Sequence, residues 1–160
     1  MQEDGEQIGQ VGWGGPTRGA KKPESAVTPE DAIAVRFLRE ALPDLVAVYR
    51  FGSTVSGQTL RESDVDFALL GLRPLEPLQR WEWQEQLATR LHRPVDLVDL
   101  LRASTVLRMQ VVSSGIVLFE SNRTARERFE TAVFSSYARL NEERREILDQ
   151  VRREGTVYGR

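Results

Sequence analysis

The chain has 160 residues, of which 40% are apolar, so it can form one domain with a hydrophobic core and is too short for two domains of ordinary size. Its 22 Lys and Arg residues nearly balance 24 Asp and Glu residues, which argues against direct binding to a nucleic-acid backbone or an acidic membrane surface. Because the chain has no cysteine, disulfides, thiolate metal ligands and cysteine nucleophiles are excluded.

Residues 1–26 are predicted to be a flexible arm. They hold six glycines and few apolar side chains, so the surface they can bury does not offset the entropy lost on ordering. No apolar run in the sequence reaches the roughly 20 residues of a membrane helix, and the N-terminus lacks the charged-then-apolar order of a signal peptide. We therefore expect a cytoplasmic protein with one folded domain over residues 27–160.

The first helix is predicted to start after Thr28. Thr28 is a favourable N-cap, Pro29 suits the first helical position, and Asp31 is an acid in the first turn. Pro43 closes the helix. The apolar residues that recur every four positions between these points are Ile33, Phe37 and Ala41.

Four short strands follow, predicted from β-branched, aromatic and apolar runs. They span residues 45–51, 64–70, 95–98 and 116–119. Between the second and third strands, a helix after Pro77 carries Trp83, Leu87 and Leu91 at four-residue spacing. Before the fourth strand, Ser104 can cap a helix that runs to about residue 112. Helices that alternate with short strands predict an α+β or mixed α/β domain with one small sheet.

The last predicted element is one long helix over residues 124–153. Its apolar residues recur at steps of three, four or seven: Phe129, Val133, Tyr137, Leu140, Ile147 and Val151. A helix of roughly 30 residues is about 45 Å long, whereas a sheet of short strands spans about 17–20 Å. We therefore expect residues 129–140 to pack on the sheet, and Ile147 and Val151 to pack on a partner protein or a second copy of the chain.

The residues that suggest a chemistry follow the first strand and open the second. Because side chains alternate along a strand, Asp64 and Asp66 are predicted to lie on one face. Two such carboxylates repel each other unless a cation lies between them. Mg²⁺ suits this pair, because it binds a few carboxylate oxygens and completes its shell with water and phosphate.

A third carboxylate, Asp96, lies inside the third predicted strand, where a charge needs a partner. If the two strands are neighbours, three carboxylates can hold two Mg²⁺ ions, activate an attacking hydroxyl and neutralise a triphosphate. Gly52 lets the backbone approach a phosphate, and Ser53, if it opens a helix, offers a hydroxyl and N–H groups to the same anion. Asp99 competes with Asp96, but we expect it to lie past the strand and to cap the next helix.

Taken singly, these signals also fit a turn at Gly52 and a solvated strand end at Asp64. In combination, they resemble the nucleotidyltransferase superfamily related to DNA polymerase beta, whose mark is Gly-Ser, a spacer, Asp-x-Asp and a later Asp. Over about residues 46–120 the sequence resembles more closely the minimal nucleotidyltransferase antitoxins that are paired with HEPN ribonuclease toxins. That group shares the ten-residue spacer after Ser53, a serine at Ser63 and the Val95–Val98 segment.

The resemblance implies a polymerase beta-like fold: one small mixed sheet flanked by helices and followed by a long C-terminal helix. It also implies a Mg²⁺-dependent enzyme that transfers AMP from ATP to a tyrosine hydroxyl of a cognate HEPN toxin and neutralises it in a hetero-oligomer. The implied catalytic and metal-binding residues are Asp64, Asp66 and Asp96, and the nucleotide-binding residues are Gly52, Ser53 and Arg61. Arg61 is included because Ser56 replaces an arginine that the group often has after Gly-Ser.

Two other functions are compatible with the same motif. An antitoxin that neutralises by binding alone would carry a vestigial site, although the presence of all three acids and Ser53 argues against complete decay. A small-molecule nucleotidyltransferase of the aminoglycoside-modifying kind would need a substrate-binding region. After Phe119 this chain offers mainly one helix, so a protein acceptor is favoured.

Overall fold

The computed structural model describes residues 27–55 and 63–154. Its elements are α1 (Pro29–Ala41), β1 (Leu45–Phe51), the 3-10 helix η1 (Gly52–Thr54), β2 (Val65–Gly71), α2 (Pro77–Leu91), β3 (Val95–Asp99), α3 (Thr105–Ser114), β4 (Ile116–Glu120) and α4 (Arg123–Glu154). All four strands and α4 begin and end within one residue of the predicted bounds. The predicted arm over residues 1–26, Ser56 and Arg61 lie outside the described residues.

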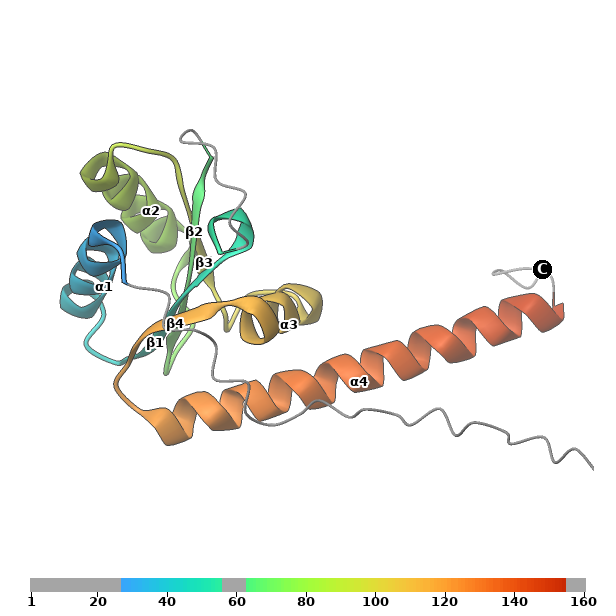
Figure 1. The fold of residues 1–160 in the computed structure, drawn as a ribbon. Coiled ribbons are helices and arrows are strands. Elements are labelled where there is room, and N and C mark those ends of the chain that lie inside the picture. The colour runs from blue at the N-terminus through green and yellow to red at the C-terminus, as the bar shows by residue number, and fades with distance from the viewer. Residues whose placement is uncertain (1–26, 56–62, 155–160) are drawn as a thin grey trace, which may run out of the picture.

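The four strands form one mixed sheet in the order β3-β2-β1-β4. β1 is antiparallel to β2 and β4, and β2 is parallel to β3. Figure 1 shows α1 and α2 on one side of this sheet and α3 and α4 on the other. The arrangement confirms the predicted α+β fold with a small mixed sheet, flanking helices and a long C-terminal helix.

Each face of the sheet has its own hydrophobic core. On the α1 and α2 face, the buried side chains include Leu38, Val48, Phe67, Leu87 and Leu97. On the α3 and α4 face, they include Val46, Tyr49, Phe51, Ala68 and Val111. Because helices cover both faces, β1 is buried along its whole length, which explains why its sequence is an unbroken apolar run except for one arginine. Among the described residues, no helix is both long and apolar enough to cross a membrane.

That arginine, Arg50, forms a buried ion pair that ties β1 to α1. Its Nη1 lies 2.6 Å from Oδ2 of Asp31, and both side chains are almost fully buried. The same carboxylate oxygen accepts a 2.8 Å hydrogen bond from the backbone N–H of Thr28 and completes the capping box at the start of α1. Asp31 therefore fixes both the beginning of α1 and its position on the sheet.

The first half of α4 packs against α3 and β1, and the second half extends beyond the sheet (Figure 1). The Tyr49 hydroxyl on β1 donates a 3.0 Å hydrogen bond to Glu130, and Arg126 donates to both Glu130 and Glu120. Val133 is buried on the same half. By contrast, Ile147 is 55% exposed, as expected if the distal half does not touch its own domain. That it contacts another protein stays a prediction.

The buried ion pair predicts an asymmetric response to charge removal. Asp31→Asn leaves Arg50 charged in the core, so the free energy of unfolding should fall by about 3 kcal/mol. Glu127→Gln, which breaks the exposed pair with Arg123, should change it little, because solvent screens that pair. Urea denaturation at pH 7 measures both variants. Equal, small losses would mean that the buried pair does not stabilise the fold.

Candidate active site

The end of β1 and the beginnings of β2 and β3 meet at one end of the sheet. Phe51, the last residue of β1, is opposite Asp66 in the antiparallel pair. Asp66 is in turn beside Asp96 in the parallel pair of β2 with β3. Residues in register on neighbouring strands point to the same face, so Asp66 and Asp96 are neighbours there. The condition that the second and third strands be neighbours is thus met.

Gly52 is pressed against the Asp66 carboxylate. Its φ of +77° is unfavourable for other residues, and a Cβ at this position would lie 2.1 Å from Oδ2 of Asp66. A side chain at residue 52 would therefore collide with the carboxylate. From the sequence, the predicted role of Gly52 is to let a phosphate approach the backbone. The structure adds that Gly52 also leaves space for the Asp66 side chain.

Ser53 has an exposed side chain next to this contact. Ser53 lies in η1, which spans only three residues. Val55 caps the end of this turn, and its backbone N–H donates a hydrogen bond to the Gly52 carbonyl. The expectation that Ser53 opens a helix holds only for this single turn. A turn this short lacks the aligned peptide dipoles of a full α-helix, so the hydroxyl and local N–H groups are what it can offer to an anion.

The three predicted aspartates differ in exposure. Asp64 precedes β2 and is exposed, Asp66 is half-buried inside β2, and Asp96 is exposed on β3. The pKa of Asp66 is raised from 3.8 to about 6, first by burial and then by the negative charges of Asp96 and Asp64. The negative charges of Asp64 and Asp96 therefore both act on the Asp66 carboxylate.

The carboxylates of Asp64, Asp66 and Asp96 do not form a closed metal cage. Within residues 27–55 and 63–154, no three His, Asp or Glu side chains gather closely enough to hold a metal ion together. Mg²⁺ does not need such a cage, because it is commonly held by one or two carboxylates and completes its shell with water and substrate phosphates. The repulsion that raises the pKa of Asp66 is the kind that a cation relieves. The donor set thus fits Mg²⁺ bound together with a nucleotide.

Asp99 corrects one expectation. It is the last residue of β3 rather than a residue beyond the strand, and it is 2% exposed. Its carboxylate accepts hydrogen bonds from the backbone N–H groups of Leu75 and Leu101, while Ser104 caps α3. Alternation along β3 puts Asp99 on the opposite face from Asp96, so Asp99 has a structural role and is separate from the cluster.

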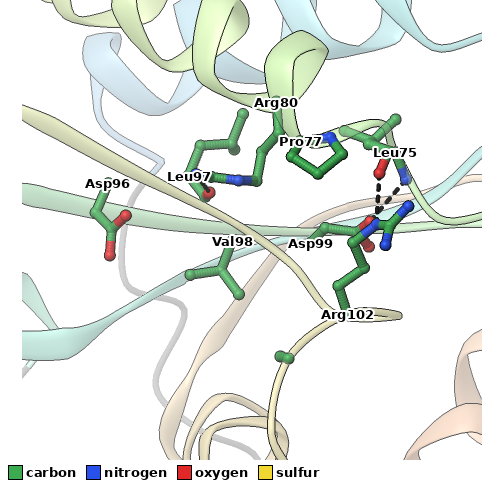
Figure 2. Close-up of a pocket in the computed structure, with 9 residues that line it drawn as sticks. Leu75, Pro77, Arg80, Asp96, Leu97, Val98, Asp99 and Arg102 are labelled. Carbon is green, nitrogen blue, oxygen red and sulfur yellow. Dashed lines mark hydrogen bonds between the residues drawn. The ribbon is translucent and has the colours of Figure 1, made fainter.

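A groove of about 300 Å³ runs along the outer edge of β3 and ends at Asp96 (Figure 2). Figure 2 shows Asp96 at one end and Asp99 with Arg102 at the other. Arg80 and Gln84 of α2 bond the outward-facing carbonyl and N–H of Leu97. At Leu97 the edge of β3 is therefore unavailable for pairing with another strand, and a molecule in the groove contacts the side chains that line it. Sequence reasoning missed Arg80 and Arg102, because no local pattern marks them.

The raised pKa of Asp66 predicts a pH-dependent stability in metal-free buffer. Between about pH 4 and pH 6 the folded chain binds more protons than the unfolded chain, so stability should fall as pH rises. Asp66→Asn should remove this slope and gain about 1–2 kcal/mol above pH 6, allowing for solvent screening. Asp149→Asn, an exposed change on distal α4, should keep it. Urea denaturation with EDTA across this range measures the slope, and an unchanged slope in Asp66→Asn would contradict the assignment.

Residues 35–124 match the family described as polymerase beta, nucleotidyltransferase. The protein adenylyltransferase MntA of Shewanella oneidensis is 41% identical over 117 residues, which are 73% of this chain and 84% of that protein.

Two solved structures are similar in both sequence and fold. One is a toxin–antitoxin crystal structure with AMP-PNP, at a TM-score of 0.70 and 40% identity, covering 78% of this chain and 98% of that one. Another holds a tri-AMPylated Shewanella oneidensis HEPN toxin in complex with an MNT antitoxin, at a TM-score of 0.65 and 37% identity, covering 76% and 95%. Because the family match spans more than half of the chain and includes the row formed by Gly52, Asp66 and Asp96, this chain belongs to the polymerase beta nucleotidyltransferase family.

Proposed function

We propose that this protein transfers AMP from ATP to a tyrosine hydroxyl of a cognate HEPN-family toxin and thereby neutralises it. The observation that carries the proposal is the row of Gly52, directly after β1, Asp66 on β2 and Asp96 on β3. The similarity to a protein adenylyltransferase and to toxin–antitoxin structures, one with an AMPylated toxin, supports the reaction and the partner.

The residues of the proposed active site have different roles. Gly52 allows a phosphate to approach the backbone, and Ser53 offers its hydroxyl to the same phosphate. Asp64 and Asp66 would hold one Mg²⁺ on the triphosphate, and Asp66 and Asp96 would hold a second. When bound, Mg²⁺ neutralises charge on the triphosphate and on the departing pyrophosphate. Arg61 remains a proposed nucleotide ligand.

In the transfer step, the tyrosine oxygen bonds to the α-phosphorus and the bond to the β-phosphate oxygen breaks, which releases pyrophosphate. A carboxylate oxygen of Asp96 accepts the hydroxyl proton, because Asp96 is exposed and lies on the β3 side of Asp66. Gly52 and Ser53 lie on the β1 side. The nucleotide and the acceptor therefore approach from opposite sides, and the groove along β3 is the acceptor side.

Removal of each aspartate charge tests the chemistry. Asp64→Asn, Asp66→Asn and Asp96→Asn should each lower AMP transfer by at least about 100-fold while the protein stays folded, because shape is kept and a metal-binding charge is lost. Asp149→Asn serves as a matched control. Mass spectrometry of the co-expressed toxin measures the attached AMP.

The same variants separate catalysis from neutralisation by binding alone. If they form the complex yet leave the toxin unmodified and active, adenylylation is the neutralising step. If the toxin stays neutralised without AMP, the protein acts by binding. Full transfer by any of the three variants would contradict the role given to that residue.

The exposed distal half of α4 is proposed to contact the toxin. Ile147→Asp with Val151→Asp should leave thermal melting unchanged and abolish co-elution with the toxin, because it places two charges on an apolar stripe. Arg145→Gln with Arg152→Gln makes the same change in net charge on another side of the helix and should preserve the complex. Size-exclusion chromatography of the co-expressed pair compares the variants, and co-elution of both would exclude this contact.

A further inference from the structure

We infer that Arg93 is a positioning residue that holds Asp64 in place, an inference that rests on the proposed function. Asp64 lies outside the regular part of β2, and its side chain is exposed. A residue at such a place is ordinarily free to change its backbone conformation. A metal-binding carboxylate needs the opposite, because its oxygens must keep a fixed position relative to Asp66.

The backbone on both sides of Asp64 is bound to the segment that leads into β3. The Arg93 Nη2 group donates a hydrogen bond to the carbonyl oxygen of Ser63. The backbone N–H of Val65 donates a 3.0 Å hydrogen bond to the carbonyl oxygen of Pro94. Asp64 is the single residue between these two anchored positions, so its φ and ψ angles are restricted from both ends.

Arg93 is itself fixed by α1. Its Nη1 group donates to both carboxylate oxygens of Glu30, at 3.3 and 3.2 Å, and its side chain is 17% exposed. A guanidinium group presents several donors in one rigid plane, so it can bond a carboxylate and a carbonyl at the same time. Lysine concentrates its charge on one nitrogen and matches this geometry less well.

The short segment between α2 and β3 also favours a positioning role for Arg93. His92 ends α2 in the left-handed conformation, with φ of 51°, and Pro94 follows Arg93 directly. These two neighbours restrict the backbone at residue 93. The guanidinium that bonds the Ser63 carbonyl oxygen therefore extends from a rigid turn. The ion pair with Glu30 thus links the first turn of α1, the turn before β3 and the residue before Asp64.

Arg93→Gln tests the role, with Arg93→Lys as the conservative variant. Arg93→Gln should weaken Mn²⁺ binding in the presence of AMP-PNP by about 10-fold or more and lower kcat similarly, whereas KM for the toxin stays unchanged. Arg93→Lys should recover part of both losses. Arg90→Gln serves as the control, because the Arg90 side chain hydrogen-bonds within α2 and its guanidinium lies over the Phe37 ring of α1. This variant should keep wild-type Mn²⁺ binding and kcat.

Hydrogen exchange in metal-free, nucleotide-free protein provides a readout that does not depend on activity. The Val65 amide should exchange at least about 10-fold faster in Arg93→Gln, while amides in the core of β1 keep their protection. Glu30→Gln, which leaves Arg93 in place, should give a smaller increase. If wild-type protein transfers no AMP, the proposed function fails, and the exchange data still decide whether Arg93 fixes this segment. Wild-type Mn²⁺ binding together with unchanged Val65 exchange in Arg93→Gln would overturn the inference.

Discussion

The parallel pairing of β2 with β3 is the constraint on which the rest of the site depends. Parallel strands run in the same direction, so both begin at the same end of the sheet, and the observed register puts Asp66 beside Asp96. The antiparallel pairing of β1 with β2 brings Gly52 to the same place. A shift of β3 by one residue relative to β2 would turn Asp96 to the opposite face of the sheet and bury it among the α2 side chains.

This arrangement holds like charges together at an energetic cost that the fold must offset. Burial and the charges of Asp96 and Asp64 raise the pKa of Asp66 to about 6, so the site without a cation is strained electrostatically. Contacts that are distant from the carboxylates supply the rigidity. Asp31 and Arg50 fix α1 on β1, Asp99 fixes the loop before α2, and helices bury both faces of the sheet.

The two halves of α4 differ in their contacts with the rest of the domain. The first half is tied to the sheet through Tyr49, Glu130 and Arg126, and burial together with Glu130 raises the pKa of the Tyr49 hydroxyl, which therefore stays a donor. In the second half, residues 141–150 are all exposed within the part of the chain that the structure describes. A helix that is anchored at one end can present apolar residues at its other end to a partner while the packing of the folded domain stays intact.

The sequence by itself determined the order of helices and strands, the capping box at Thr28, the Asp-x-Asp pair and the place of Asp96 within a strand. These features depend on neighbours a few residues apart, so local patterns reveal them. Only the tertiary structure decided the roles of Arg50, Arg93 and Asp99. Arg50 meets an acid 19 residues away, Arg93 meets partners 30 and 63 residues away, and Asp99 bonds an N–H 24 residues away. No periodicity marks such contacts, because chain folding and strand register, rather than local spacing, bring these residues together.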